Sequence, residues 1–384
     1  MNFSQVFEYY SRDDVQNALL GVSASREVSG ILRDGKFGSR PNMLAYKNDI
    51  GQMVRSNSVS FHGSVERWSN PMSLAAGMKR QDLDKLRTGF DLLLDLDFKV
   101  FDHAKIAAKI FIDALKKHGV KSIFLKYTGG KSFHIAVPFE SFPETVNYRP
   151  TRLQYPEIPE TIVKYLNGFV RHKLEREIFR IEPDIEELAN KLNVPLNELL
   201  REERFEIGLF GSNQTKSVQI KMLPESGLFS SRHLFRLPYS LHESSFLASV
   251  PLKISDIDGF KKEDAAPDKV KVKEKFLFDV QKSDADAAGL VIEALDWAAK
   301  ETKPEPLRSK PVFTEKSVIT KEFFPPCIMK ILGGMSDGRK RSLFILINFL
   351  RNMNWSMDRI EEEVNEWNQR NTQPLPATYL RGQV

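Results

Sequence analysis

The sequence holds a single cysteine, Cys327, among 384 residues. One thiol excludes an internal disulfide framework, and it excludes a zinc or iron–sulfur site built from several cysteines of this chain. No apolar run approaches the roughly 18–20 residues that a membrane-spanning helix needs. The opening MNFSQVFEYYSRDD lacks the basic segment and apolar stretch of a signal peptide. These absences predict a soluble, intracellular, cytoplasmic protein with no membrane partner.

The chain also has little excess of charge of either sign. Lys and Arg number 56 against 51 Asp and Glu, which leaves a net charge of +5. This excess is compatible with a polyanionic partner but does not identify one. The chain is 41% hydrophobic and 28% charged, which excludes disorder as its main state and indicates a globular protein of one large domain or two ordinary ones.

The pattern of apolar residues predicts a mixed fold. Helical spacing covers 1–20 and 103–118, and an apolar run interrupted by carboxylates at 90–97 indicates a buried central strand. Further strands are expected at 122–127 and 132–137. The centre of the chain is therefore predicted to be β-α-β-turn-β.

Later segments are mostly helical. One helix is expected over 157–178, another over 285–300, and two short ones within 183–204. The short pair also fits a DNA-reading helix-turn-helix, although such pairs are more often packing units. Charge runs and proline breaks divide the chain into a first domain over 1–260, a linker with one helix over 261–321 and a small helical domain over 322–384.

The strongest chemical feature is the pair Asp95 and Asp97 at the end of the apolar run. Alternate residues of a strand point to one face, so both carboxylates project together. Their repulsion is relieved when a divalent cation such as Mg²⁺ or Mn²⁺ binds, because these ions prefer hard oxygen ligands. The alternative is a strand end whose acids face water.

A glycine turn between two expected strands is the second feature, in Lys126-Tyr-Thr-Gly-Gly-Lys-Ser-Phe-His134. The glycines let a ligand approach the backbone. Lys131, Ser132 and His134 then offer a cation, a hydroxyl and an imidazole, a set that suits a triphosphate. A strand follows the turn, so it is not a Walker A loop. The alternative is a plain hairpin with a surface lysine.

The third feature is a concentration of nitrogen donors in SRHLFRLPYSLH, residues 231–242. It contains Arg232, His233, Arg236 and His242. A site for a polyanion would use such donors, with Arg236 as a clamp of fixed charge. The alternative is a surface loop with incidental basic residues.

These three features follow one another in a fixed order: D-x-D at a strand end, a small-Gly-x-x-x-x-His hairpin, and Arg-x-Pro-x-Ser-x-His. That order resembles the archaeo-eukaryotic primase superfamily, specifically the small catalytic subunit of archaeal and eukaryotic DNA primases. The resemblance covers roughly residues 58–252. It includes 61–71 before the first motif and 89–97 as the motif itself, and 231–242 is its most specific part.

The resemblance implies an α/β fold of the α+β type, a primase core with an RRM-like catalytic sheet. It also implies two metal ions, Mg²⁺ or Mn²⁺, held by Asp95, Asp97 and a third carboxylate. The third is usually an aspartate shortly before the Arg-x-Pro-x-Ser-x-His motif, and Glu225 stands in that place here. A glutamate reaches one methylene further than an aspartate, so the geometry and rate are expected to change, or the site is damaged.

The implied activity is template-directed nucleotidyl transfer on single-stranded DNA, in primer synthesis and extension by two-metal catalysis. Lys131, Ser132 and His134 would contact the phosphates of an incoming NTP or dNTP, and Arg236 and His242 would complete the pocket. A helicase or another replication protein is an expected partner. Tyr127 and Trp68 are candidate surfaces for stacking the template bases.

The last part of the chain carries a second resemblance. Phe324-Pro-Pro-Cys-Ile-Met-Lys-Ile-Leu332, followed by helices over 339–352 and from an N-cap at Ser356 to Trp367, resembles the start of the iron–sulfur domain of the primase large subunit. That domain needs four cysteines, so neither an iron–sulfur cluster nor zinc is expected in this chain. Arg339, Lys340 and Arg341 are candidates for binding template or the initiating triphosphate.

Two other functions are consistent with the motifs. A phosphohydrolase of the haloacid dehalogenase type also uses D-x-D at a strand end, but Lys99 stands where such enzymes usually have Thr or Val. The replacement of the usual aspartate by Glu225 is compatible with a catalytically impaired core that binds nucleic acid or nucleotides.

Overall fold

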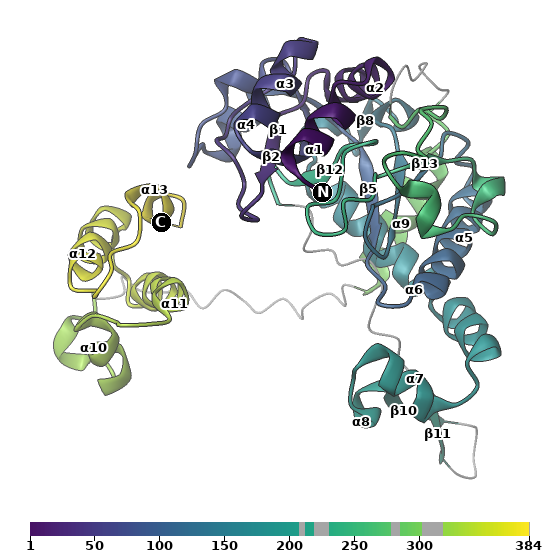
Figure 1. Cartoon of the computed structure of the whole chain (residues 1–384). Coiled ribbons are helices and arrows are strands. Elements are labelled where there is room, and N and C mark those ends of the chain that lie inside the picture. Colours follow the sequence, from purple (N-terminus) through teal and green to yellow (C-terminus); the bar gives the residue numbers. More distant parts are fainter. Residues whose placement is uncertain (207–211, 219–229, 278–284, 302–317, 384) are drawn as a thin grey trace. The chain divides into compact units, whose positions relative to one another are not determined.

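The structure, a computed structural model, describes residues 1–206, 212–218, 230–277, 285–301 and 318–383 (Figure 1). The chain folds into two compact units, Met1–Ser73 with Leu86–Thr302, and Leu74–Lys85 with Lys303–Val384. Both helices and antiparallel sheets are present, so the fold is of the α+β type. Among the described helices, none combines the length and the hydrophobicity that crossing a bilayer requires.

A four-stranded antiparallel sheet forms the centre of the first unit. Its strands are β5 (Leu92–Leu96), β6 (Phe124–Tyr127), β7 (Phe133–Val137) and β13 (Pro251–Leu252), in the order β13-β6-β7-β5. Helix α5 (Phe101–Lys117) connects β5 to β6, which confirms the predicted β-α-β-turn-β order. The prediction that 90–97 is a central strand is wrong, because β5 lies at an edge of this sheet.

Helices cover one face of this sheet and bury the apolar side of β5 (Figure 1). Helix α5 packs on β7 and on α6 (Glu157–Ile181), and α6 contacts β5. Leu92, Leu94 and Leu96 point into this core and are at most 1% exposed. The other face of β5 stays free to carry polar groups, so an edge strand can be apolar on alternate residues and still hold a site.

Helix α9 (Ala288–Glu301) packs against α6 and belongs to the first unit. The sequence analysis placed this helix in a linker. Leu290, Val291 and Ala294 bury its apolar face, and this packing is not visible from the charged residues that surround the helix in the sequence.

A second, three-stranded sheet has the order β1-β2-β12 and is also antiparallel. Its strands are β1 (Val28–Leu32), β2 (Ser58–Ser64) and β12 (Leu234–Arg236). Helix α3 (Lys47–Arg55) contacts β2 and packs on α1 (Phe3–Tyr10). Strand β12 comes from the motif-rich stretch 231–242 and pairs with β2, so it brings that stretch beside residues that are about 170 positions earlier.

The helix predicted over 1–20 is two helices, α1 and α2 (Asp13–Ser23). Ser11 caps the end of α1, and its backbone N–H donates to carbonyls of the last turn. Asp13 and Asp14 open α2, where carboxylates are favoured by the partial positive charge of a helix N-terminus. Apolar spacing alone does not reveal this break, because the apolar face continues across it.

Short elements complete the first unit. Strand β3 (Glu66–Trp68) pairs with β4 (Arg87–Phe90), and β8 (Thr145–Val146) pairs with β9 (Arg149–Pro150). Of the two short helices expected within 183–204, α7 (Ile185–Leu192) forms, but α8 (Leu196–Leu199) stops after four residues. Strand β10 (Leu200–Glu206) follows and pairs with β11 (Ser212–Val218).

The described part of the second unit consists mostly of helices α10 (Pro326–Leu332), α11 (Arg339–Asn352), α12 (Met357–Gln369) and α13 (Ala377–Arg381). Helix α4 (Arg80–Leu86) is contributed by the segment Leu74–Lys85 and extends to Leu86. The predicted helix over 339–352 is confirmed, and Ser356 caps α12 by accepting the backbone N–H of Arg359. Apolar side chains of these helices, among them Leu343, Trp355 and Trp367, form a core of their own.

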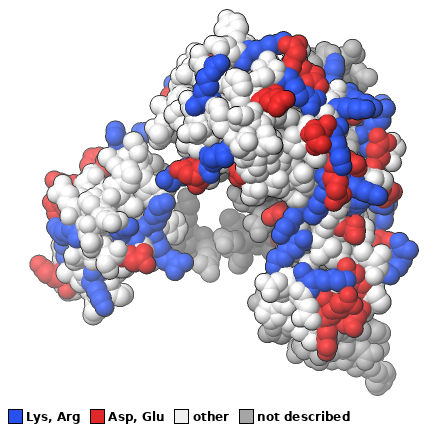
Figure 2. Space-filling model, viewed as in Figure 1, with Lys and Arg blue, Asp and Glu red and all other residues white. Residues whose placement is uncertain are grey.

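Charges of both signs are interspersed over the face drawn in Figure 2. The small positive excess is therefore not gathered into one patch on this face, and the net charge does not locate a site. A functional site is instead expected where polar side chains converge.

Candidate functional site

A cavity of about 240 Å³ lies between the four-stranded sheet and the three-stranded sheet. Six of the residues that the sequence analysis assigned to metal or nucleotide binding line it together: Asp95, Asp97, Ser132, His134, Arg236 and His242. They come from β5, from the turn and strand β7, and from β12 with the loop after it. Three motifs separated by up to about 150 residues thus meet at one place.

Asp95 and Asp97 reach the cavity because β5 alternates. Leu93, Asp95 and Asp97 line the cavity, whereas Leu92, Leu94 and Leu96 face the core. The predicted shared face of the two carboxylates is therefore present. The Asp95 side chain is 32% exposed, and Asp97 lies further out, beyond the end of β5.

The two carboxylates supply oxygen ligands of the kind that Mg²⁺ and Mn²⁺ prefer. Within the part of the chain that the structure describes, no group of three His, Cys, Asp or Glu side chains is arranged to hold a metal ion. Glu225, the predicted third ligand, lies outside the described residues. Asp95 and Asp97 therefore fit a cation site in donor chemistry but account for only part of a ligand set.

A row of three polar residues crosses the sheet behind the cavity. Lys126 on β6 is in register with His134 on β7, and His134 is in register with Asp95 on β5. His134 Nε2 lies 3.4 Å from Asp95 Oδ1. Lys126 is fully buried, and its Nζ donates to Ser249 Oγ at 2.9 Å. The row thus places a buried lysine, an imidazole and a carboxylate side by side.

This row sets the protonation of its members. Burial lowers the pKa of Lys126 well below its usual value, with Arg236 acting in the same direction. Burial and the nearby Lys126 also lower the pKa of His134 to about 4. Burial acts to raise the pKa of Asp95, but contacts with His134 and Lys126 outweigh it, so that pKa falls. Asp95 is therefore a carboxylate at neutral pH, beside a neutral imidazole.

The second ring nitrogen of His134 carries an energetic cost. Nδ1 is buried, and it has no hydrogen-bond partner among the described residues. A buried polar atom without a partner costs about 1–3 kcal/mol.

The glycine turn approaches His242 as closely as backbone allows. Gly129 has a φ of +87°, and a Cβ there would stand 2.7 Å from the Leu247 carbonyl oxygen and 2.9 Å from His242 Cβ. A Cβ on Gly130 would stand 3.0 Å from His242 Nε2. Gly129 is therefore required by conformation and by space, whereas a Cβ on Gly130 would only crowd the His242 ring. The turn thus brings the hairpin motif against the Arg-x-Pro-x-Ser-x-His motif.

His242 presents a donor toward this turn. Its Nδ1 accepts the backbone N–H of Ser244 at 3.2 Å, so in the neutral ring the proton is on Nε2. Burial and Arg236 lower the pKa of His242, which favours that neutral form. Thr128 Oγ1 and Ser132 Oγ lie 3.2 Å apart at the same turn, and both residues line the cavity.

Arg236 is held by its own network. Its Nη1 donates to Ser60 Oγ, to the Leu241 carbonyl at 3.1 Å and to Glu243 Oε2 at 2.7 Å. Glu243 therefore offsets part of the guanidinium charge. An anion that enters the cavity would compete with Glu243 for Arg236, so its binding depends on how easily that pair separates.

Two further histidines line the cavity, His62 on β2 and His233 just before β12. His233 belongs to the donor-rich stretch, but His62 was not selected from the sequence. His62 pairs in register with Arg236, and this pairing places it opposite a residue that is 174 positions later. Burial lowers the pKa of His62 well below its usual value and also lowers that of His233.

Arg232 does not line the cavity, although it was expected to serve a polyanion site. Its guanidinium pairs with Glu27, which also accepts two hydrogen bonds of 2.9 Å from Arg40. The Glu27 side chain is fully buried, and the backbone N–H of Arg232 donates to Glu66. These contacts hold Arg232 at a φ of +62°, directly before His233.

The other predicted residues lie elsewhere. Lys131 is exposed and is not among the residues that line the cavity. Arg339, Lys340 and Arg341 open α11 in the second unit; there Arg339 donates to the Gln373 carbonyl, and Lys340 lies 5.2 Å from the centre of the Tyr379 ring. Tyr127 and Trp68 are fully buried, so the suggestion that they stack bases is wrong.

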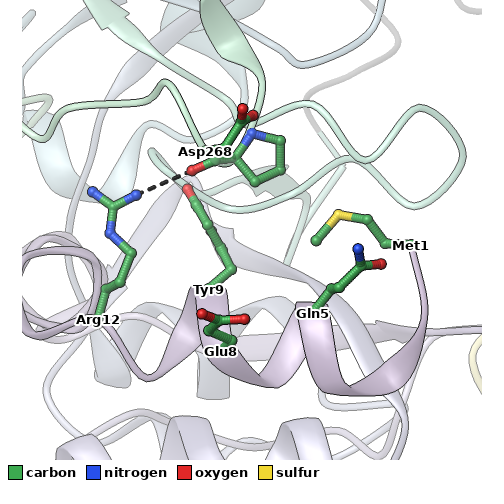
Figure 3. A pocket seen from close by; sticks show the side chains of 7 residues that line it. Met1, Gln5, Glu8, Tyr9, Arg12 and Asp268 are labelled. Carbon is green, nitrogen blue, oxygen red and sulfur yellow. Dashed lines mark hydrogen bonds between the residues drawn. The ribbon is translucent and has the colours of Figure 1, made fainter.

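A larger cavity of about 470 Å³ lies beside α1 (Figure 3). Met1, Gln5, Glu8, Tyr9, Arg12 and Asp268 line it with Pro267. Arg12 is occupied by the Pro267 and Val270 carbonyls and by Asp14, and the Tyr9 hydroxyl donates to the Tyr239 carbonyl. Its strongest donors are thus already paired, and none of the three motifs reaches it.

No family model matches the sequence, and no curated protein matches it. The structure is similar to the polymerase domain of Mycobacterium tuberculosis ligase D in complex with DNA. That similarity has a TM-score of 0.39 with 14% sequence identity, and it covers 78% of this chain and 89% of the other. Because this similarity is weak, the function is inferred from the residues of the site.

Proposed function

We propose that the chain is a primase-polymerase, a metal-dependent enzyme that transfers nucleotidyl groups from NTP or dNTP on a single-stranded DNA template. The observation that carries the proposal is the convergence of six motif residues on one cavity. If the motifs were only a surface loop and a solvated strand end, there would be no reason for their residues to line one cavity.

The chain's own groups suit a triphosphate. Ser132 and Thr128 supply hydroxyls, His242 supplies Nε2–H, and Arg236 supplies a fixed positive charge from the floor of the cavity. Lys131, exposed beside this turn, would contact the outermost phosphate. These donors would fix the position of the substrate, which is the main protein contribution to phosphoryl transfer.

The acids would stand at the reacting end. Asp95 and Asp97 would hold Mg²⁺ or Mn²⁺, with Glu225 as the third carboxylate. Glu225 precedes His233 by eight residues, and an extended chain covers about 3.3–3.6 Å per residue, so the chain length permits this contact. Bound divalent cations would neutralise charge on the phosphates during transfer. His134, between Asp95 and the buried Lys126, would keep the Asp95 carboxylate ionised and oriented.

Primer synthesis and extension on a single-stranded template test the proposal, with Mg²⁺ or Mn²⁺ and labelled nucleotides. The double variant Asp95→Asn/Asp97→Asn should lose at least about 100-fold in rate, a loss typical of removing a group that stabilises the transition state. Asp113→Asn, an exposed acid on α5, is the matched control and should keep the rate.

Two outcomes would replace the proposal. If the wild-type chain binds template or nucleotide but makes no product with either cation, the impaired nucleic-acid-binding core is the better description. If it releases phosphate from small phosphomonoesters and makes no polymer, the phosphohydrolase is the better description.

A further inference from the structure

We propose that Phe37 is a stacking surface for the base of the nucleotide that the cavity holds. The inference rests on the proposed function, because it assigns the position of the base of that same substrate. The juxtaposition that carries it is an exposed phenyl ring packed against a histidine that lines the cavity.

The register of the three-stranded sheet places Phe37 on the cavity face. Phe37 forms a bridge with Ile31 of β1, and Ile31 is in register with Ser60 of β2. Partners in register point to the same face, and residues two apart on a strand do so too. Phe37, Ser60 and His62 therefore share one face, and His62 lines the cavity from it.

The two rings touch. The centroids of Phe37 and His62 are 5.6 Å apart at an interplanar angle of 77°, an edge-to-face contact. His62 is buried, whereas Phe37 is 52% exposed. One side of Phe37 thus packs against the lining residue His62, and about half of Phe37 meets solvent.

The small size of the cavity favours such a surface. Sites that enclose a ligand of nucleotide size usually measure about 300–1,000 Å³, and this cavity measures about 240 Å³. This volume suits the phosphates, and we place the base outside it. Phe235 is the one phenyl ring among the described lining residues, and it is 3% exposed and lies under Lys126. Phe37 is an exposed ring in contact with His62, which lines the cavity.

The donors also give the nucleotide a direction. Ser132 and His242 lie at the glycine turn of the four-stranded sheet, and His62 lies in the other sheet, opposite Arg236. A triphosphate that contacts the turn and Arg236 would extend its sugar and base past His62, toward Phe37.

Binding measured with three ligands tests the inference: a nucleoside triphosphate, inorganic triphosphate and a single-stranded oligonucleotide. Phe37→Ala should weaken binding of the nucleoside triphosphate about 5- to 150-fold, since base stacking on an aromatic ring contributes about 1–3 kcal/mol. Inorganic triphosphate, which has no base, should bind Phe37→Ala as well as it binds wild type. Phe37→Trp should retain nucleoside triphosphate binding.

Phe37→Trp also provides a direct signal that is independent of affinity. Its added fluorescence should be quenched by the nucleoside triphosphate and not by inorganic triphosphate. The control is Tyr148→Trp, at a fully exposed residue of the turn between β8 and β9, which should show no quenching. Circular dichroism of each variant checks that the fold is intact, and Phe37→Leu replaces Phe37→Ala if the latter unfolds.

The outcomes separate this inference from the proposed function. If Phe37→Ala or Phe37→Leu binds nucleoside triphosphate as tightly as wild type, or loses both triphosphates equally, Phe37 does not stack the base. Loss of oligonucleotide binding alone would assign the ring to a template base and also overturn the proposal. If wild type binds neither triphosphate, the proposed function fails together with the inference.

Discussion

Asp91, the first acid of the Phe90–Asp97 run, is expected to be structural, and neutralising it should destabilise the first unit. Its carboxylate accepts hydrogen bonds from Arg26, Arg67 and the backbone N–H of Phe139. The side chains of Asp91, Arg26 and Arg67 are 1%, 2% and 19% exposed. Water therefore screens these ion pairs little, and Asp91→Asn would leave buried positive charge without its partner.

Breaking a buried ion pair by removing one partner costs about 3–5 kcal/mol. Arg67 keeps Glu140, and the other nitrogens of Arg26 donate to backbone carbonyls, so only the Arg26–Asp91 charge balance is lost completely. Asparagine still accepts from Phe139. We therefore expect the lower end, about 3 kcal/mol, which at an unfolding entropy of about 2.1 cal/mol/K per residue is about 5 °C in Tm for a unit of this size.

Urea unfolding followed by circular dichroism measures the change, and only the transition of the first unit should move. Asp258→Asn, which breaks the exposed pair with Lys109, is the control and should cost less than about 1 kcal/mol. The double variant Asp91→Asn/Arg26→Met should lose less than the sum of the single changes. A loss for Asp91→Asn no larger than that of the control would refute the reasoning.

The same contact gives a pH dependence with a definite sign. Burial acts to raise the pKa of Asp91, but Arg67 and Arg26 outweigh it, so the folded-state pKa lies below the unfolded value of about 3.9. The stability that the ionised group contributes is complete above that unfolded value and disappears as the pH falls through the folded-state pKa. The difference between wild type and Asp91→Asn should therefore shrink in acid.

Three further changes have expected outcomes that unfolding and activity assays can check. Gly129→Ala should cost more than Gly35→Ala and reduce activity, because both glycines have positive φ but only the Cβ at Gly129 would meet backbone and His242; equal losses would contradict this. Tyr148→Gly should stabilise by about 0.5–1 kcal/mol, since Tyr148 occupies a left-handed turn position that favours glycine, and a loss of stability would count against it. Leu343→Ala should destabilise the second unit by about 2–5 kcal/mol through a cavity in its core and leave nucleotide binding by the first unit unchanged.

Much of the fold and half of the site could be predicted because the signals are local. Alternation in Leu92–Asp97 places both acids on one face without knowledge of the neighbouring strands. The glycine pair at 129–130 marks a turn, and the donor-rich stretch 231–242 marks a site through its composition. Helices α5 and α11 were predicted within two residues of their bounds because a continuous apolar face is a local pattern.

What could not be predicted depends on partners far away in the sequence. The edge position of β5, the packing of α9 on α6 and the contact of His62 with Arg236 are set by strand order and register. The exposure of aromatic residues is equally non-local. Tyr127 and Trp68 are fully buried while Phe37 is half exposed, although nothing in the adjacent residues distinguishes these rings.

The role of Lys126 also depends on partners that are distant in the sequence. In the sequence it is one lysine of a short apolar strand, and the simplest expectation for such a residue is a solvated strand edge. Its neighbours on both sides give it a different role: Ser249 Oγ accepts a hydrogen bond from its Nζ, Phe276 lies 5.5 Å from Nζ, and His134 separates it from Asp95. Burying an ammonium group is costly, and Asp95, across a single strand, offsets only part of that cost, so the pKa of Lys126 still falls. The electrostatics of the acid pair thus arises from the register of three strands, since a slip of one residue would turn Lys126 away from the row and leave Asp95 without that charge.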